Sequence, residues 1–144
     1  MDNNLIVSQS INIHAPLSKV WDGLTRPEII KEYLFGTETV TDWKVGSEVI
    51  FKGEYKGQTY QDHGIILENK FQERISYSYW SKFTGTEDKP ENYSRVTYTL
   101  HPVTEQLTSF TWTTQGFTSE QGYEHSKNGM KEFLEKIREA IEKS

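Results

Sequence analysis

Apolar and polar residues alternate along most of this chain, in short runs separated by turn residues. In residues 5–13, Leu5 and Val7 share one face of an extended segment, and Ile11 and Ile13 continue the alternation. A period of two predicts a strand with one buried face. Similar runs recur at hairpin spacing, which is typical of an antiparallel sheet. We expect the later strands at residues 37–43, 47–55, 58–68, 74–80, 93–101 and 106–114.

Two short helices are predicted between the first and second strands. The first begins at Ala15-Pro16, since proline is well placed in the first turn of a helix. Residues 25–28 (Thr-Arg-Pro-Glu) have the spacing of a capping box, which predicts a second helix over 28–33, ended by Gly36. The apolar face of the first helix is Val20, Trp21 and Leu24.

The end of the chain, residues 118–144, has the pattern of one long amphipathic helix. Thr118, followed three residues later by Gln121, predicts its start as a capping box. One apolar stripe follows at helical spacing, so this helix is expected to cross a face of the sheet. The stripe is Met130, Phe133, Leu134, Ile137 and Ile141.

Turns are expected at 44–46, 56–57, 69–70 and 102–105, and the longest loop at 83–92, which is polar and contains Gly and Pro. The order of elements predicts an α+β fold. A curved antiparallel sheet of six or seven strands wraps around the C-terminal helix, with two short helices after the first strand. Such an architecture leaves room for a cavity between sheet and helix. A length of 144 residues predicts a single domain over 1–144.

Aromatic residues supply much of the expected burial, because the chain has four Trp, eight Tyr and seven Phe but an apolar fraction of only 34%. Each ring buries about 150–250 Å². Large rings interdigitate less closely than branched aliphatic side chains, so this core can tolerate a cleft.

Charge and composition exclude several classes of function. The net charge is −5, which argues against binding to nucleic acid or to an anionic membrane surface. The chain has no cysteine, so it has no disulfide, thiol nucleophile or thiolate metal site. Residues 1–4 lack the features of a signal peptide, and no apolar run is long enough to span a membrane, so we expect a cytoplasmic protein. No cofactor or metal is predicted.

Residues 13–25 (IHAPLSKVWDGLT), continued by Pro27-Glu28, resemble the opening of the START-like (SRPBCC, helix-grip) proteins. Within that superfamily, the chain is most similar to the branch related to the C-terminal domain of activators of the 90-kDa heat-shock chaperone ATPase. Supporting segments are 43–47 (WKVGS), 64–68 (GIILE), 75–80 (ISYSYW) and the hairpin at 97–117. The resemblance implies the helix-grip fold, an internal cavity, and a place among stress-response proteins.

Two departures from that branch bear on the cavity. The branch often has a Trp pair where this chain has Tyr33-Leu34-Phe35, and Gly-Trp where this chain has Gly129-Met130. Ligand preference is therefore expected to differ from that of relatives. Full-length chaperone activators also carry a separate N-terminal domain that contributes to chaperone binding, and 144 residues are not expected to contain it.

The main candidate site is a set of apolar side chains, predicted to bind a small hydrophobic or amphipathic molecule. Alternation places these side chains on the sheet face toward the last helix, with Tyr33 and Phe35 near the cavity mouth. Hydroxyl groups of Tyr and the indole N–H of Trp112 would orient the ligand. The set is Tyr33, Phe35, Phe51, Ile66, Tyr77, Tyr79, Tyr98, Phe110, Trp112, Met130, Phe133 and Ile137. The alternative for each ring is that it only fills the core.

Two other functions stay open. The first is a chaperone-linked interaction module, with a chaperone or another protein as partner and a monomer or weak homodimer as the working form. The second is a cyclase-, aromatase- or hydrolase-like enzyme, which would need a polar residue deep in the cavity. Glu68, Tyr98 and His125 are the candidates for that role, since Glu68 shares the alternation of Ile66. Asp62 and His63 are adjacent on a strand and therefore cannot form a dyad.

Overall fold

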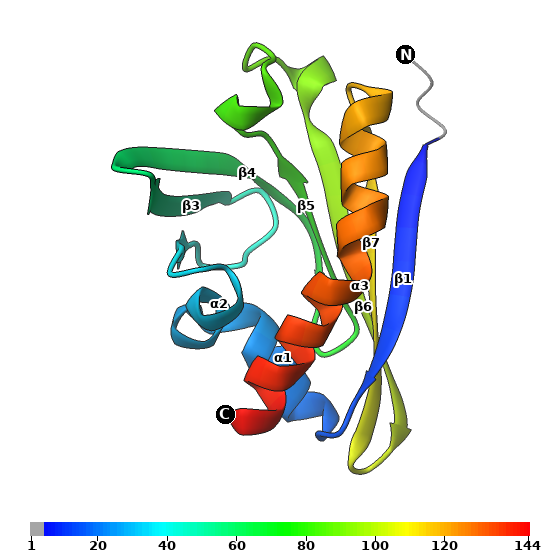
Figure 1. The fold of residues 1–144 in the computed structure, drawn as a ribbon. Helices are drawn as coiled ribbons and strands as arrows, with labels where there is room; N and C mark the ends of the chain where they lie inside the picture. Colours follow the sequence, from blue (N-terminus) through cyan, green and yellow to red (C-terminus); the bar gives the residue numbers. More distant parts are fainter. Residues whose placement is uncertain (1–4) are drawn as a thin grey trace.

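The computed structural model describes residues 5–144. The start of the chain, on which the signal-peptide expectation rests, lies outside these residues. An antiparallel sheet curves around one long helix, as predicted (Figure 1). Within the described residues the sheet has seven strands, in the order β1-β7-β6-β5-β4-β3-β2. The strands are β1 (Ile6–Ile13), β2 (Glu38–Val40), β3 (Glu48–Tyr55), β4 (Gln58–Lys70), β5 (Arg74–Tyr79), β6 (Ser94–Thr104) and β7 (Leu107–Gln115).

The helices are α1 (Leu17–Thr25), α2 (Pro27–Tyr33) and α3 (Glu120–Lys143), together with the short 3₁₀ turns η1 (Lys82–Thr84) and η2 (Pro90–Asn92). The pair α1 and α2 lies between β1 and β2 in the chain and packs beside the C-terminal half of α3 (Figure 1). The helix-grip architecture expected from the sequence is confirmed.

The core lies between the concave face of the sheet and α3. Alternation along β6 and β7 turns Tyr98, Phe110 and Trp112 inward, as the pattern predicts. The α3 stripe meets them, and Phe133 alone in it stays partly exposed. Burial of such side chains stabilises the fold by about 25 cal/mol per Å² of apolar surface. The buried α3 residues are Met130, Leu134, Ile137, Ala140 and Ile141.

Both predicted capping boxes were wrong in detail. Thr25 ends α1, where its hydroxyl donates to the carbonyl of Trp21 at 2.9 Å. Arg26 is the N-cap of α2 and is extended, because the following proline disfavours helical backbone at that position. At the start of α3, Ser119 rather than Thr118 is the N-cap, and its Oγ accepts from the Gly122 N–H at 3.0 Å.

Three strand boundaries also differ from prediction. The strand expected at 37–43 is shorter in the structure, where β2 ends at Val40 and Trp43, at φ 64°, lies outside the extended region. β4 continues through Asn69 and Lys70, and the turn follows at 71–73, with Gln72 at φ 60°. Pro102 lies in β6 rather than in the turn, next to a shift of register that accommodates its missing N–H.

No helix in the region from residue 5 to 144 is long and apolar enough to traverse a membrane. Over the same residues, no three His, Asp or Glu side chains gather as metal ligands would.

Candidate functional site

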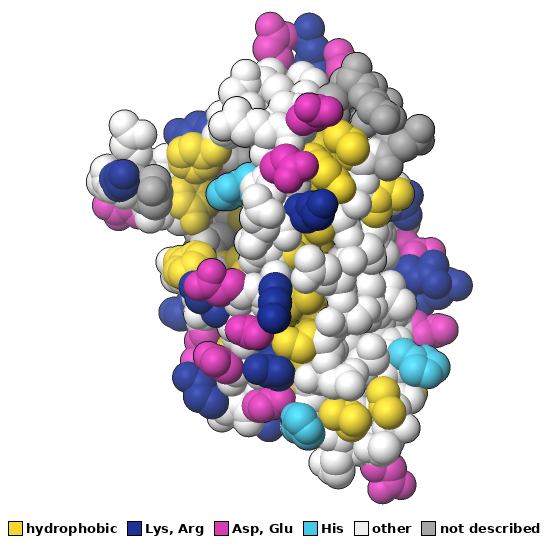
Figure 2. Space-filling model, turned by 45° about the vertical axis from the view of Figure 1, so that its right-hand side comes forward, with side chains coloured by type: hydrophobic (Ala, Val, Ile, Leu, Met, Phe, Trp, Pro, Cys, Tyr) yellow, Lys and Arg dark blue, Asp and Glu magenta, His cyan; other side chains and the backbone are white. Residues whose placement is uncertain are grey.

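A cavity of about 970 Å³ lies between the concave face of the sheet and the N-terminal half of α3. Ligand pockets typically have about 300–1,000 Å³. The loop from β5 to β6 closes one side, and Figure 2 shows hydrophobic side chains beside the projecting β3–β4 hairpin, where the surface is hollowed. Most of the exposed surface of the wall is apolar, and its apolar and aromatic residues include Phe51, Tyr77, Tyr79, Val96, Trp112 and Phe133.

The cavity exists because α3 has two unlike halves. The C-terminal half carries the apolar stripe and fills the space against the sheet. The N-terminal half presents Gly122, Ser126 and Gly129, which are small and lie three or four residues apart on one face. A Cβ atom added to Gly129 would have no heavy atom within 4 Å. These small side chains leave space between this half of α3 and the sheet, where the cavity lies.

Aromatic rings stiffen the cavity wall by packing edge to face or tilted. The Phe51 ring lies 5.7 Å from that of Tyr77 and 5.8 Å from that of Tyr79, measured between centroids. In another part of the wall, the Trp112 ring on β7 packs edge to face against the Phe133 ring on α3, with 5.0 Å between their centroids. Such pairs contribute about 0.5–1.5 kcal/mol each beyond their burial, so these walls are held in place without a ligand.

One carboxylate, Asp62 on β4, lies in this apolar wall. It is only 6% exposed, and its Oδ2 accepts a hydrogen bond from the Tyr79 hydroxyl at 2.6 Å. Burial, followed by the charge of Asp62, raises the pKa of Tyr79 far above its ordinary value, so this hydroxyl keeps its proton. Ser81, also buried, begins the loop beside them.

The mouth of the cavity is formed by residues from three segments. Thr37 and Tyr60 share a hydrogen bond of 2.6 Å between their hydroxyls, and the Tyr60 ring lies 5.7 Å from that of Phe83. Phe35 is 80% exposed with φ 54°, and the Nζ of Lys136 lies 4.6 Å from its ring. A cation over an aromatic face is attractive, so α3 is tied to the loop after α2 at this rim.

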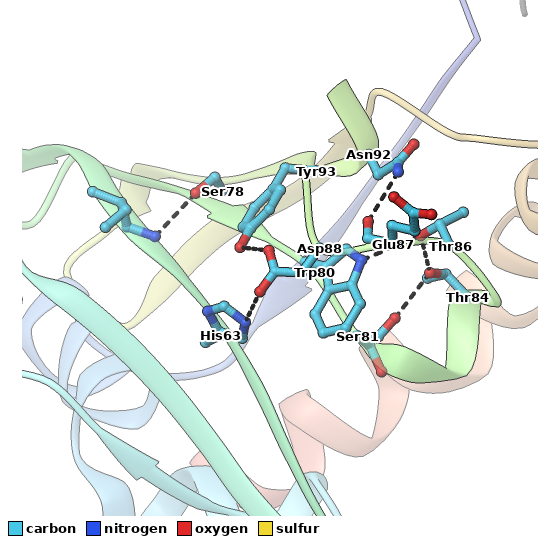
Figure 3. Close-up of polar contacts among 11 residues, drawn as sticks. His63, Ser78, Trp80, Ser81, Thr84, Thr86, Glu87, Asp88, Asn92 and Tyr93 are labelled. Carbon is cyan, nitrogen blue, oxygen red and sulfur yellow. Dashed lines mark hydrogen bonds and ion pairs between the residues drawn. The ribbon is translucent and has the colours of Figure 1, made fainter. Parts of the chain in front are cut away.

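The loop from β5 to β6 is fastened to the outer face of the sheet (Figure 3). His63 Nε2 lies 3.0 Å from a carboxylate oxygen of Asp88, and the Tyr93 hydroxyl donates to the other oxygen. The Trp80 indole donates to Thr86 at 3.2 Å. His63 therefore faces away from Asp62 beside it, which confirms that the two do not form a dyad.

Seven of the twelve predicted binding residues line the cavity: Phe35, Phe51, Tyr77, Tyr79, Trp112, Met130 and Phe133. The other five do not line it and instead lie buried in the core: Tyr33, Ile66, Tyr98, Phe110 and Ile137. Tyr33 is not near the mouth, because its hydroxyl donates to the Gly23 carbonyl at 3.0 Å beneath α2. Alternation sorts residues by face but does not give their depth.

Sequence reasoning passed over several lining residues, above all Asp62, Tyr60 and Ser81. A signal for Asp62 was present, because it shares the alternation of Tyr60, Gly64 and Ile66 and lies opposite Phe51 in the β3–β4 register. Polar residues on a strand pattern are usually assigned to the solvent face, so the pattern alone does not single out Asp62.

The three candidates for an acid or base occupy different places. Glu68 does not point inward as expected, since a register shift between Ile66 and Glu68 reverses the alternation and places it beside Arg74 at 3.5 Å, on the outer face. Tyr98 is buried in the core, where its hydroxyl shares a hydrogen bond of 2.7 Å with Tyr77. His125 lies at the cavity mouth on α3.

The fold and the cavity define a protein of the helix-grip class. The family model described as "Activator of Hsp90 ATPase homolog 1-like protein" matches residues 14–142, and the chain belongs to that family. None of the curated protein sequences compared with this chain matches it.

Solved structures agree with this fold. The solution structure of ChR145 from Cytophaga hutchinsonii is 40% identical, with a TM-score of 0.83 over 99% of this chain and 97% of that one. PFC0360w, described as an HSP90 activator from Plasmodium falciparum, is 18% identical, with a TM-score of 0.72 over 93% and 94%. DynU16, a putative protein in the dynemicin biosynthetic locus, is 15% identical, with a TM-score of 0.76 over 99% of this chain but 48% of that one. At these lower identities the likeness concerns the fold alone.

Proposed function

We propose that this protein binds a small hydrophobic or amphipathic molecule in the cavity between the sheet and α3. The observation that carries the proposal is a space of about 970 Å³ whose exposed surface is mostly apolar, with nine Phe, Tyr and Trp side chains in its wall beside one buried carboxylate. Apolar walls with a small number of placed polar groups are typical of ligand sites. We assign no chemistry to the site, and we propose a cytoplasmic location for the whole 144-residue domain.

The binding residues of this proposal are those of the predicted set that line the cavity, with Asp62 and Tyr60 added. The rings of Phe51, Trp112 and Phe133 would cover the body of the ligand. Burial of the ligand surface would supply the binding free energy, because apolar surface contributes about 25 cal/mol per Å² removed from water.

Gly129 offers a direct test, since a larger side chain there would occupy the cavity mouth. Binding of 1-naphthylmethanol is measured by calorimetry with the parent chain, Gly129→Phe and the control Gly129→Ala. The parent and Gly129→Ala are expected to bind equally, and Gly129→Phe about tenfold more weakly or not at all. Equal binding by all three, or binding by none, would contradict the proposal.

A second candidate is a chaperone-linked interaction module. It is favoured by the family to which the chain belongs and by the fold of the Plasmodium falciparum HSP90 activator. The test is the ATPase rate of a 90-kDa heat-shock chaperone with and without this protein. Stimulation that persists in Gly129→Phe would favour a chaperone-binding surface separate from the cavity.

A further inference from the structure

One carboxylate oxygen of Asp62 is a hydrogen-bond acceptor without a partner among the described residues. Its Oδ2 accepts from Tyr79, but its Oδ1 is buried without a hydrogen-bond partner among the residues that the structure describes. Only Thr39 Oγ1 shares this condition in that part of the chain, and Thr39 does not line the cavity. Buried polar atoms in native proteins almost always have a partner, which can be a ligand or water.

No cation among the described residues of the cavity wall compensates Asp62, because the wall contains neither Lys nor Arg. Two lysines that lie beside lining residues are engaged elsewhere. Lys82 donates to the Thr59 carbonyl at 3.4 Å, and Lys136 lies over the exposed ring of Phe35. His125, the basic residue of the lining, is at the exposed mouth.

The neighbours of Asp62 suit a positive charge. Phe51 lies directly opposite it in the register of β3 and β4, and the Phe51 ring packs against those of Tyr77 and Tyr79. Aromatic faces attract cations, most strongly where water is excluded. A carboxylate beside several rings therefore favours a cation over a neutral donor, and it repels a second carboxylate.

We propose that Asp62 is the polar anchor of the cavity and that the ligand carries a hydrogen-bond donor, first of all a protonated amine, on an apolar body. This inference rests on the proposed ligand-binding function and specifies the chemical class of the ligand's head group. The ammonium would donate to Oδ1 of Asp62 after a small movement of the side chains that now cover this atom. Tyr79 already donates to Oδ2, so Oδ1 is the oxygen left for the ligand.

The test compares three probes that share one naphthalene body: 1-naphthylmethylamine, 1-naphthylmethanol and 1-naphthoic acid. Calorimetry at neutral pH and low salt gives the three dissociation constants. The amine is expected to bind about tenfold more tightly than the alcohol, and the acid more weakly than both. The alcohol reports the cavity together with a neutral donor, since it fills the same space without charge and its O–H can donate to Asp and Asn oxygens alike.

Two variants assign the preference to Asp62. Asp62→Asn keeps the shape but removes the charge, and the control Glu54→Gln removes the same charge from an exposed position on β3. Asp62→Asn should lose about tenfold in amine affinity and leave the alcohol unchanged, whereas Glu54→Gln should change neither. Equal loss in both variants would show a long-range effect of net charge and overturn the assignment.

A third variant keeps the inference falsifiable if Asp62→Asn does not fold. Tyr79→Phe retains the ring but removes the donor on Oδ2, which leaves both carboxylate oxygens free for an ammonium. Amine affinity should rise, and a fall in it with unchanged alcohol affinity would contradict the proposal. If the parent chain binds the alcohol but does not prefer the amine, the Asp62 anchor is wrong while the ligand-binding function stands. If no probe binds, both are wrong.

Discussion

Gly64 on β4 lies directly against the backbone of β5, so that a Cβ atom at this position would be 1.6 Å from the carbonyl oxygen of Ser78. The obstacle is backbone and cannot rotate away as a side chain could. Gly64→Ala is therefore expected to lower the free energy of unfolding by about 3 kcal/mol or more through overpacking. Urea denaturation followed by circular dichroism measures the loss.

The matched control for that substitution is Gly129→Ala, on α3, where an added Cβ meets nothing within 4 Å. Alanine is the better helix former, so this variant should gain about 0.5–1 kcal/mol. A Gly64→Ala protein as stable as the parent would contradict this close contact. It would show that β4, which carries Asp62, can move away from β5.

The start of α3 depends on Ser119, whose Oγ accepts from the Gly122 N–H at 3.0 Å. Ser119→Ala should cost about 1 kcal/mol, because an N–H group of the first turn loses its partner. Thr118→Ala, one residue earlier, should cost much less. Thermal unfolding of the two variants distinguishes them, and equal effects would contradict the assignment of the cap.

Substitutions at two residues of α3, Ile137 in the core and Phe133 in the cavity wall, should differ in their cost to stability. Ile137 is fully buried, so Ile137→Ala should cost about 2–5 kcal/mol. Phe133 faces the cavity and is only partly buried, so Phe133→Ala leaves fewer contacts broken and should cost less than Ile137→Ala despite the larger truncation. Denaturation midpoints give the comparison. A greater loss for Phe133→Ala would mean that the space beside it is filled by protein.

The stability of the fold should fall steeply in alkali. Burial is the main cause that raises the pKa of Tyr33, Tyr77, Tyr79 and Tyr98 above the ordinary tyrosine value. Below about pH 10 both folded and unfolded chains keep these protons, so the full stability is present. Above that pH only the unfolded chain releases them, and each tyrosine costs about 1.4 kcal/mol per pH unit.

Phenolate absorbance measured beside circular dichroism checks this prediction. The four buried tyrosines should ionise only together with the loss of ellipticity. Ionisation of all tyrosines with the fold intact would contradict their burial. Tyr79→Phe should lose stability less steeply with rising pH in alkali, since one fewer proton is released on unfolding.

The sequence predicted the fold well because its signals are periodic and local. The apolar stripe from Met130 to Ile141 and the alternation along β6 and β7 required only the geometry of helices and strands. Boundaries depended on particular contacts. Thr118 and Ser119 are both suitable caps, and in the structure Ser119 is the cap.

The cavity could be predicted only in part, because its depth depends on how α3 sits over the sheet. Tyr98 and Trp112 share a face, yet Trp112 lines the cavity and Tyr98 lies in the core. Glu68 was misplaced by a register shift that alternation cannot reveal. Asp62 follows the pattern correctly, but a charged residue there becomes meaningful only when its Tyr79 partner is seen.

The central claim is that a ligand occupies the space between α3 and the sheet, and a titration with 1-naphthylmethanol followed by two-dimensional NMR tests it most directly. We predict saturable chemical-shift changes at the Trp112 indole, the Met130 methyl and the amides around Gly129, all of which line the cavity. The exposed apolar residues Ile65 and Leu67 should not shift. Changes confined to Ile65 and Leu67, or no saturable change, would contradict the account.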